Sequence, residues 1–214
     1  MGCQTIRYAA RVRPGYRDAA TDALRAQVLA AARRTLVERD GAGAFSVDAV
    51  AAKAGVARAL VHQQFGTVSG LLEAMLDDLA THGALAVELP QVFKLPDPLD
   101  TLEQFIAVFG RVWDAERMVM RRVRNLAALD PDLARALAKR EDYRREGLRR
   151  LLTHLGRNGL SLARGPFEPL DVLFTLTAFE TFDSLAGSER RVLDVVPAVQ
   201  HVVRAALGLA LGKG

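Results

Sequence analysis

Three side chains between residues 58 and 63 have the chemistry to hydrogen-bond to the edges of nucleic-acid bases. Arg58 can donate two parallel hydrogen bonds to guanine or contact a phosphate, and Gln63 can pair with adenine or another base edge. His62 can read a base, donate to a phosphate or lie in solvent, and the neighbouring Ala59 and Leu60 can contact thymine methyl groups. Side chains of this kind read a base sequence only when a rigid element presents them to a groove.

The stretch from Ser46 to Gly66 predicts such an element. Ser46 can cap a first helix, and Gly55 falls where a residue in the left-handed conformation ends one. A second short helix is expected from about Ala57 to Gln64. One face of the first helix would be apolar, formed by Val47, Val50, Ala51 and Ala54. Two short helices joined by a tight turn make a helix-turn-helix, whose second helix enters the major groove of DNA. The alternative is an ordinary helical hairpin in a larger all-α core.

The charge distribution favours the first interpretation. Residues 1–66 contain ten Lys and Arg against five Asp and Glu, whereas the whole chain has a net charge of only +4. Excess positive charge suits a segment that must neutralise phosphates. Residues 1–20, with four arginines among small residues, are predicted to form a flexible basic arm that can reach phosphates or the minor groove. A disordered end without a partner is the alternative.

Further motifs flank the helix-turn-helix in a specific order. An amphipathic helix is expected from Thr21 or Asp22 to Leu36, and a glycine-containing break follows. After the Ala-Gly-Val turn at 54–56 come a Val-His-x-x-Phe-Gly segment and the pair Leu71-Leu72. This order resembles the N-terminal DNA-binding domain of the TetR (tetracycline repressor) family of transcriptional regulators.

The resemblance implies an organisation for the whole chain. A three-helix helix-turn-helix domain would occupy residues 21–66, and a helical ligand-binding and dimerisation domain residues 67–214. Ser46 and Thr67 would donate to phosphates, which positions a protein without reading sequence. The residues predicted to contact DNA are Ser46, Ala57, Arg58, Ala59, Leu60, His62, Gln63 and Thr67. Four features depart from the family pattern. Ala57 stands where a Ser or Thr is usual, and His62 stands where an aromatic residue is usual. Thr67-Val68-Ser69 replaces Ser-Lys-Glu, and Leu60 adds a bulky apolar side chain on the side expected to face the groove.

The remainder of the chain reads as helices, so the predicted fold is all-α. We expect a connector helix from Thr67 or Ser69 to Pro90, a linker loop over 91–100, and further helices over 101–129, 132–157, 170–186 and 194–211. Three pairs of basic residues on the helix 132–157 wind around it and are expected to lie in solvent. They are Lys139-Arg140, Arg144-Arg145 and Arg149-Arg150.

The last two helices are apolar over most of their circumference, and such helices need cover on more than one side. We expect a second copy of the chain to provide it, as a four-helix bundle between the subunits of a homodimer. Burial in the core of a monomer is the alternative.

A small-molecule effector is expected in an apolar cavity of the second domain, as in the family. The residues predicted to line it are Phe105, Phe109, Trp113, Arg117, Met120, Tyr143 and Phe174. Met118 is a further apolar candidate, and Arg117 with Arg121 could bind an acidic ligand head or face water. Each apolar residue could equally be plain core.

Other chemistry has no support in the sequence. Metal-ligand spacing, nucleophile elbows and dinucleotide fingerprints do not occur, so we predict no enzyme, no metal and no cofactor. No apolar run is long enough to span a bilayer, and the single Cys3 suits a reducing cytoplasm. The predicted function is a cytoplasmic, ligand-responsive repressor released from a palindromic operator by a small molecule. The alternative is a helical protein that binds a small molecule or a partner and has weakened or lost DNA binding.

Overall fold

A computed structural model describes residues 16–38, 45–162 and 168–209, and every regular element in these ranges is a helix. The predicted all-α fold is therefore confirmed. Most of the predicted basic arm lies outside the described residues. None of the described helices is long and apolar enough to cross a membrane.

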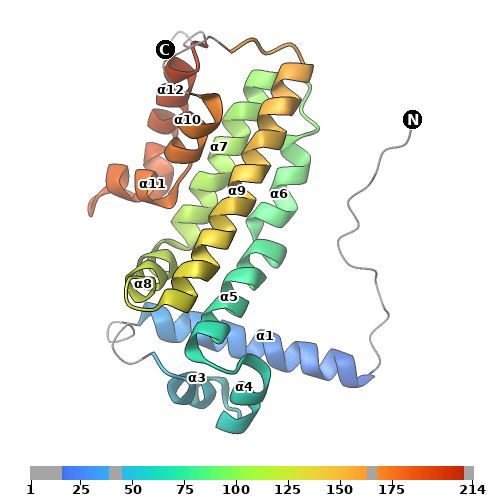
Figure 1. The fold of residues 1–214 in the computed structure, drawn as a ribbon, viewed down its shortest axis with the longest axis vertical. Coiled ribbons are helices and arrows are strands. Elements are labelled where there is room, and N and C mark those ends of the chain that lie inside the picture. The colour runs from blue at the N-terminus through green and yellow to red at the C-terminus, as the bar shows by residue number, and fades with distance from the viewer. Residues whose placement is uncertain (1–15, 39–44, 163–167, 210–214) are drawn as a thin grey trace.

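The molecule has a small head at one end of a longer helical body (Figure 1). The head consists of α1 (Tyr16–Val37), α3 (Val47–Ala54) and α4 (Arg58–Phe65). Helix α1 packs against α3 and also against α5 (Val68–His82) and α8 (Arg117–Ala127) of the body, so it belongs to both parts. It begins at Tyr16, earlier than the predicted start at Thr21 or Asp22.

The prediction of a single connector helix between Thr67 and Pro90 is wrong. The structure has two helices, α5 (Val68–His82) and α6 (Ala84–Val92), separated at Gly83, whose backbone is extended. A Cβ atom at this glycine would lie 2.2 Å from the carbonyl oxygen of Leu79, so no other residue fits the break without a shift. The helix α6 includes Pro90, and the predicted linker shortens to residues 93–97.

The long helix predicted over residues 101–129 is also interrupted. Helix α7 (Pro98–Ala115) ends at Glu116, and α8 (Arg117–Ala127) leaves it in a new direction (Figure 1). The side chain of Glu116 forms an ion pair with Arg33 of α1, so the break lies where the body meets the head.

Helix α9 (Pro131–Arg157) has nearly the predicted bounds because its start is determined locally. The Asp130 carboxylate accepts hydrogen bonds from the backbone N–H groups of Asp132 and Leu133, at 2.9 and 3.1 Å, and Pro131 suits the first turn.

The final segment contains more breaks than predicted. Residues 170–186 form two helices, α10 (Pro169–Leu176) and α11 (Phe179–Ala186), and a 3-10 turn, η1 (Val192–Val195), precedes α12 (Val196–Ala206). The interruption leaves the carbonyl of Thr177 free to accept a hydrogen bond from Trp113 Nε1 at 3.0 Å. In Figure 1 these helices lie together on one side of α7 and α9, away from α6.

Candidate DNA-binding face and internal cavity

The turn between α3 and α4 is held by local backbone interactions. The Ser46 hydroxyl accepts the N–H of Ala49 at 3.2 Å and caps α3. Gly55 ends α3 at φ 67°, a left-handed conformation that favours glycine, and the N–H of Val56 then donates to the carbonyl of Ala51 at 3.0 Å. These contacts set the direction in which α4 leaves the turn.

Helix α4 has one buried and one exposed side. Val61 and Phe65 are buried beneath it, and the guanidinium of Arg25 from α1 lies 5.0 Å from the centre of the Phe65 ring. The exposed positions coincide with residues predicted to contact DNA, namely Ala57, Arg58, Ala59, Leu60, His62 and Gln63. The structure thus brings these side chains together on one surface, and their contact with DNA stays a prediction. Thr67 lies at the next helix start, where its hydroxyl accepts the N–H of Gly70 at 3.0 Å.

Two of the exposed polar side chains already have partners within the head. Arg58 Nε lies 2.9 Å from a carboxylate oxygen of Asp48 on α3, an ion pair that crosses the turn. His62 Nδ1 lies 2.8 Å from the carbonyl oxygen of Gly66, so a proton on Nδ1 donates to the end of α4. Both contacts restrict the side chains before any DNA is bound.

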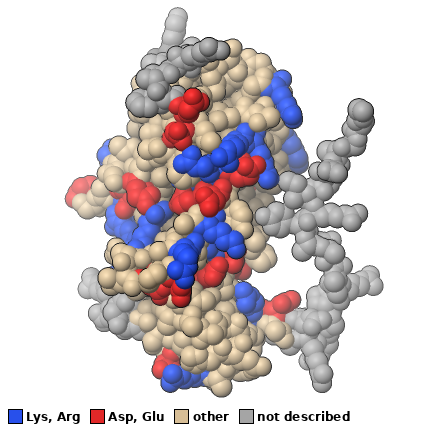
Figure 2. Space-filling model, in the orientation of Figure 1, with Lys and Arg blue, Asp and Glu red and all other residues tan. Residues whose placement is uncertain are grey.

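The positive charge of the head is partly neutralised by ion pairs. Lys53 pairs with Glu38, and Arg33 pairs with Glu116, in addition to the pair of Arg58 with Asp48. On the face shown in Figure 2, positive and negative side chains lie beside one another along the body, and the head end is largely uncharged. The described head therefore has fewer unpaired cationic side chains than the net charge of residues 1–66 suggests.

The N-terminus of α4 lacks a side-chain cap. Ala57 occupies the capping position with an extended backbone and offers no hydrogen-bond acceptor. Replacing it by serine is expected to raise the free energy of unfolding by about 0.5–1 kcal/mol, because the hydroxyl can accept an N–H of the first turn. Urea unfolding measures the change. Ala59→Ser, at an exposed position inside the same helix, is the control and should bring no gain; equal effects at both positions would contradict the capping explanation.

The body contains a partly open cavity of about 380 Å³ between α5, α6, α7 and α9. Five of the residues predicted to line a ligand site lie on its wall: Phe105, Phe109, Trp113, Met120 and Tyr143. Successive rings of Phe105, Phe109 and Trp113 are 5.2 and 5.9 Å apart, so α7 contributes a continuous aromatic wall. Leu76 and Leu79 of α5 form part of the same wall.

Two predicted residues do not line this cavity. Arg117 is directed to α11, where its Nε donates to Asp183 at 2.6 Å and its guanidinium also reaches the carbonyl of Arg190 at 2.9 Å. Phe174 lies under two guanidinium groups, 3.9 Å from that of Arg144 and 4.0 Å from that of Arg145. Both residues therefore join helices, and Arg117 lines a separate hollow of about 610 Å³.

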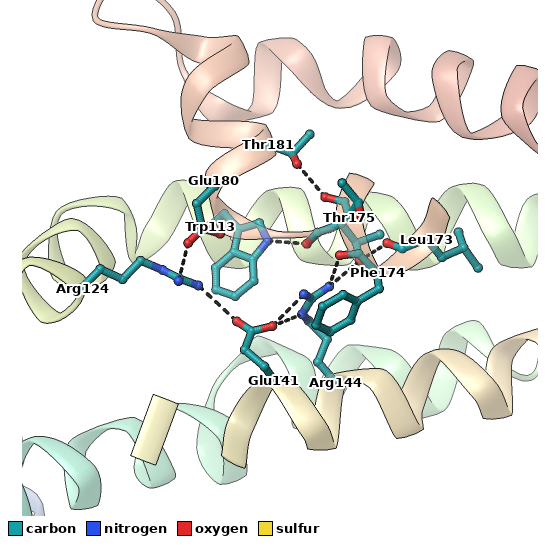
Figure 3. Close-up of polar contacts among 10 residues, drawn as sticks. Trp113, Arg124, Glu141, Arg144, Leu173, Phe174, Thr175, Glu180 and Thr181 are labelled. Carbon is teal, nitrogen blue, oxygen red and sulfur yellow. Dashed lines mark hydrogen bonds and ion pairs between the residues drawn. The ribbon is translucent and has the colours of Figure 1, made fainter. Parts of the chain in front are cut away.

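The wall also contains charged side chains that the sequence did not indicate. Glu141 lies between Arg124 of α8 and Arg144 of α9, as Figure 3 shows. Arg144 also donates to the carbonyl of Phe174 at 2.7 Å and the hydroxyl of Thr177 at 2.9 Å. The side chain of Arg144 is only 8% exposed, so the expectation that this basic pair lies in solvent is wrong.

Arg140, from the first basic pair, is also largely covered, and it donates to the carbonyl of Glu73 at 2.8 Å and to Asp77 at 2.6 Å. Arg149 and Arg150 are exposed, as expected. The carboxylate three residues before Arg144 was no signal of burial, because the same spacing links Glu146 to the exposed Arg149.

The pair of arginines on α8 gives the protein a pH-dependent link to α11. Burial by itself would raise the pKa of Asp183, but hydrogen bonds from Arg121 and Arg117 outweigh it and hold the pKa below its ordinary value of 3.8. The ionised carboxylate therefore stabilises the folded protein above that ordinary value. This contribution is lost as the pH falls through the lowered pKa of the folded state.

Asp183→Asn is accordingly expected to lower the free energy of unfolding at pH 7 and to lose this deficit as the pH falls below about 4. Urea unfolding of both proteins between pH 7 and pH 3 measures the difference. A deficit that stays constant over this range would contradict a role for the charge. Asp142→Asn, at an exposed site on α9, controls for the loss of an acidic residue at pH 7.

The fold and the head define the class of this protein as all-α with an N-terminal helix-turn-helix, the arrangement found in DNA-binding regulators. Residues 28–75 match the model of a family described as bacterial regulatory proteins, tetR family. This match confirms the resemblance inferred from the sequence for the head. Regulators of this family are not enzymes.

Solved structures with this fold extend the likeness to the body. A regulator from Mesorhizobium loti assigned to the TetR family superposes with a TM-score of 0.69 at 17% identity, over 88% of this chain and 96% of the other. PfmR, a TetR family regulator from Thermus thermophilus, gives 0.59 at 19% identity, over 84% and 98%. The fatty acid degradation regulator FadR of Bacillus halodurans gives 0.58 at 15% identity, over 83% and 96%. A comparison with curated proteins finds no match.

Proposed function

We propose that the protein is a homodimeric repressor that leaves a palindromic operator when a small molecule fills the cavity of the body. The residues that contact DNA would be those exposed on α4 with Ser46 and Thr67 at the adjoining helix starts. The head, residues 21–66, and the body, residues 67–214, would divide the two tasks of binding DNA and binding the effector and a second subunit.

The observation that carries this proposal is the course of α5. Its N-cap, Thr67, follows the last residue of α4, Phe65, by two positions. Its later turns contribute Leu76, Leu79 and Ala80 to the cavity wall. One helix of 15 residues, about 22 Å long, thus joins the recognition helix to the effector site. A ligand that displaces α5 would move α4 with it.

An exposed apolar face supports dimerisation through the last helices. On α12, Ala198, Val202 and Ala205 share one face and are exposed, and Val202 is 46% exposed. Leu185 on α11 is exposed as well. A second copy packed against this face would bury it, and a two-fold dimer presents two recognition helices to successive major grooves, about 34–36 Å apart.

Binding to the DNA upstream of the protein's own gene tests the proposal. Fluorescence anisotropy should show saturable binding to a duplex from this region, with an affinity that falls steeply as the salt concentration rises. A duplex of the same length and shuffled sequence is the control. Sedimentation of the complex should give two chains per operator. No binding at low salt, or equal binding to both duplexes, would contradict the proposal.

A second candidate function is a helical protein that binds a small molecule or a partner without reading DNA. It is favoured by the state of the head: Arg58 is paired with Asp48, Ala57 provides no cap, and Leu60 is 40% exposed where a polar contact would suit DNA. The double substitution on α4 described in the Discussion distinguishes the two functions.

A further inference from the structure

Glu116, a residue of the cavity wall, has a buried carboxylate oxygen that lacks a partner. Glu116, at the break between α7 and α8, lines the cavity and is only 8% exposed. Its Oε1 accepts a hydrogen bond from Arg33 of α1, whereas its Oε2 is buried and has no hydrogen-bond partner among the described residues. Burial of an unpaired acceptor is unfavourable, so a donor that reaches this oxygen would bind favourably.

The other charged side chains of the wall are already paired. Arg144 is held by Glu141, and Arg150 lies beside Glu146. Arg140 retains a buried Nε–H without a partner, but its terminal nitrogens donate to Asp77 and to two backbone carbonyls. Apart from the single Nε–H of Arg140, an anionic ligand would therefore have to compete with ion pairs, whereas a hydrogen-bond donor finds an unpartnered oxygen on Glu116.

We propose that the cavity binds an apolar molecule that carries a hydrogen-bond donor, and that this donor contacts Oε2 of Glu116. The aromatic wall of α7 and the leucines of α5 would hold the apolar part. A protonated amine would bind most tightly because its hydrogen bond to the carboxylate is charge-assisted, and a hydroxyl would supply the same bond without the charge.

The same carboxylate connects the cavity to the head. Arg33 reaches Glu116 from α1, and α1 packs against α3 of the helix-turn-helix. A cation on Oε2 would offset the negative charge that holds Arg33 and so weaken the link between α1 and the body. A second hollow of about 610 Å³, lined by Arg33, Arg34 and Asp114 among others, adjoins this link and leaves room for the arginine to move. This effect on DNA rests on the proposed function, whereas ligand binding at Glu116 does not.

Trp113 allows binding to be measured without DNA. It is the single tryptophan of the chain and lines the cavity, so its fluorescence reports on a bound ligand. The full chain is titrated with three probes of matched tail, decylamine, 1-decanol and decanoate, each below its micelle concentration. We expect decylamine to bind most tightly and decanoate at least about tenfold more weakly than decylamine. Binding of decanoate equal to or tighter than that of decylamine would overturn the proposal.

Two substitutions test the charge of Glu116 and its ion pair with Arg33 separately. Glu116→Gln keeps the size of the side chain but removes its charge, and should weaken decylamine by about tenfold or more while changing 1-decanol by less than about threefold. Arg33→Gln leaves Glu116 in place and should bind decylamine at least as tightly as the unmodified chain. Unfolding curves establish that both variants fold. If Glu116→Gln does not fold, the ranking of the three probes on the unmodified chain still decides.

Anisotropy with the operator duplex completes the experiment. Decylamine should lower the DNA affinity of the unmodified chain, and Arg33→Gln should reduce that effect because the link is already absent. Decylamine binding that does not depend on Glu116 overturns this inference and leaves the proposed function standing. Glu116-dependent binding without any effect on DNA supports the ligand site and contradicts release by a ligand.

Discussion

Replacing Arg58 and Gln63 together by alanine is expected to remove specific operator binding. Each side chain that pairs with a base contributes about 1–3 kcal/mol of discrimination, so the two together should lower the affinity at least about thirtyfold. Both side chains are exposed on α4, whose buried contacts come from Val61 and Phe65, so the head should remain folded. Fluorescence anisotropy with the upstream duplex measures the loss.

The matched control removes the same two side-chain types from the body. Arg149 on α9 and Gln91 on α6 are exposed and far from the head in the sequence. Alanine at both positions should leave DNA affinity unchanged. If the α4 double variant binds DNA as tightly as this control, Arg58 and Gln63 do not read bases, and a protein that binds a ligand or partner without reading DNA becomes the better interpretation.

Replacing Arg144 by methionine is expected to cost about 3 kcal/mol of stability, the largest loss for any single ion pair in the described body. Methionine keeps much of the apolar stem but none of the donors. The carbonyl of Phe174, the hydroxyl of Thr177 and one oxygen of Glu141 would lose their partner at a site where little water reaches them. Removing one partner of a buried ion pair typically costs about 3–5 kcal/mol. Because Glu141 would keep its ion pair with Arg124, we expect a loss near the lower end of this range.

The same substitution at Arg149 is the control for this measurement. Arg149 pairs with Glu146 at 3.2 Å, and both side chains are about half exposed. An exposed pair contributes at most about 1 kcal/mol, so urea unfolding of Arg149→Met should resemble that of the unmodified chain. Equal and small losses at both positions would show that the network in Figure 3 orients the helices without adding to the free energy of unfolding.

The features that the sequence predicted correctly depend on interactions between residues close together in the chain. Ser46 caps α3 through Ala49, and Gly55 ends the same helix. Asp130 caps α9 through the N–H groups of Asp132 and Leu133. Caps and left-handed turns act within one turn of a helix, so residue types at a fixed spacing identify them. For this reason the all-α class, the helix-turn-helix and the bounds of α9 follow from the sequence.

The helix breaks were not predicted because the spacing of apolar residues is the same on both sides of each break. The residues on both sides of Gly83 and of Glu116 face the same core, so the helical period continues through each interruption. The chain changes direction at Glu116, whose side chain accepts a hydrogen bond from Arg33, 83 positions away in the chain. The carbonyl of Thr177, at the break between α10 and α11, accepts a hydrogen bond from Trp113, 64 positions away. These partners exist only once the helices have packed.

The candidate site divides in the same way. The exposed positions of α4 and the aromatic stripe of α7 follow from helical spacing, because one helix determines which of its own residues share a face. The paired state of Arg58, the burial of Arg144 and the unpaired oxygen of Glu116 were decided by tertiary structure, since burial and the approach of a second helix determine whether a charge is solvated, paired or left without a partner. The sequence by itself determined a helix-turn-helix head on an all-α body, and the packing of α1, α5, α7 and α9 decided which charges face the cavity.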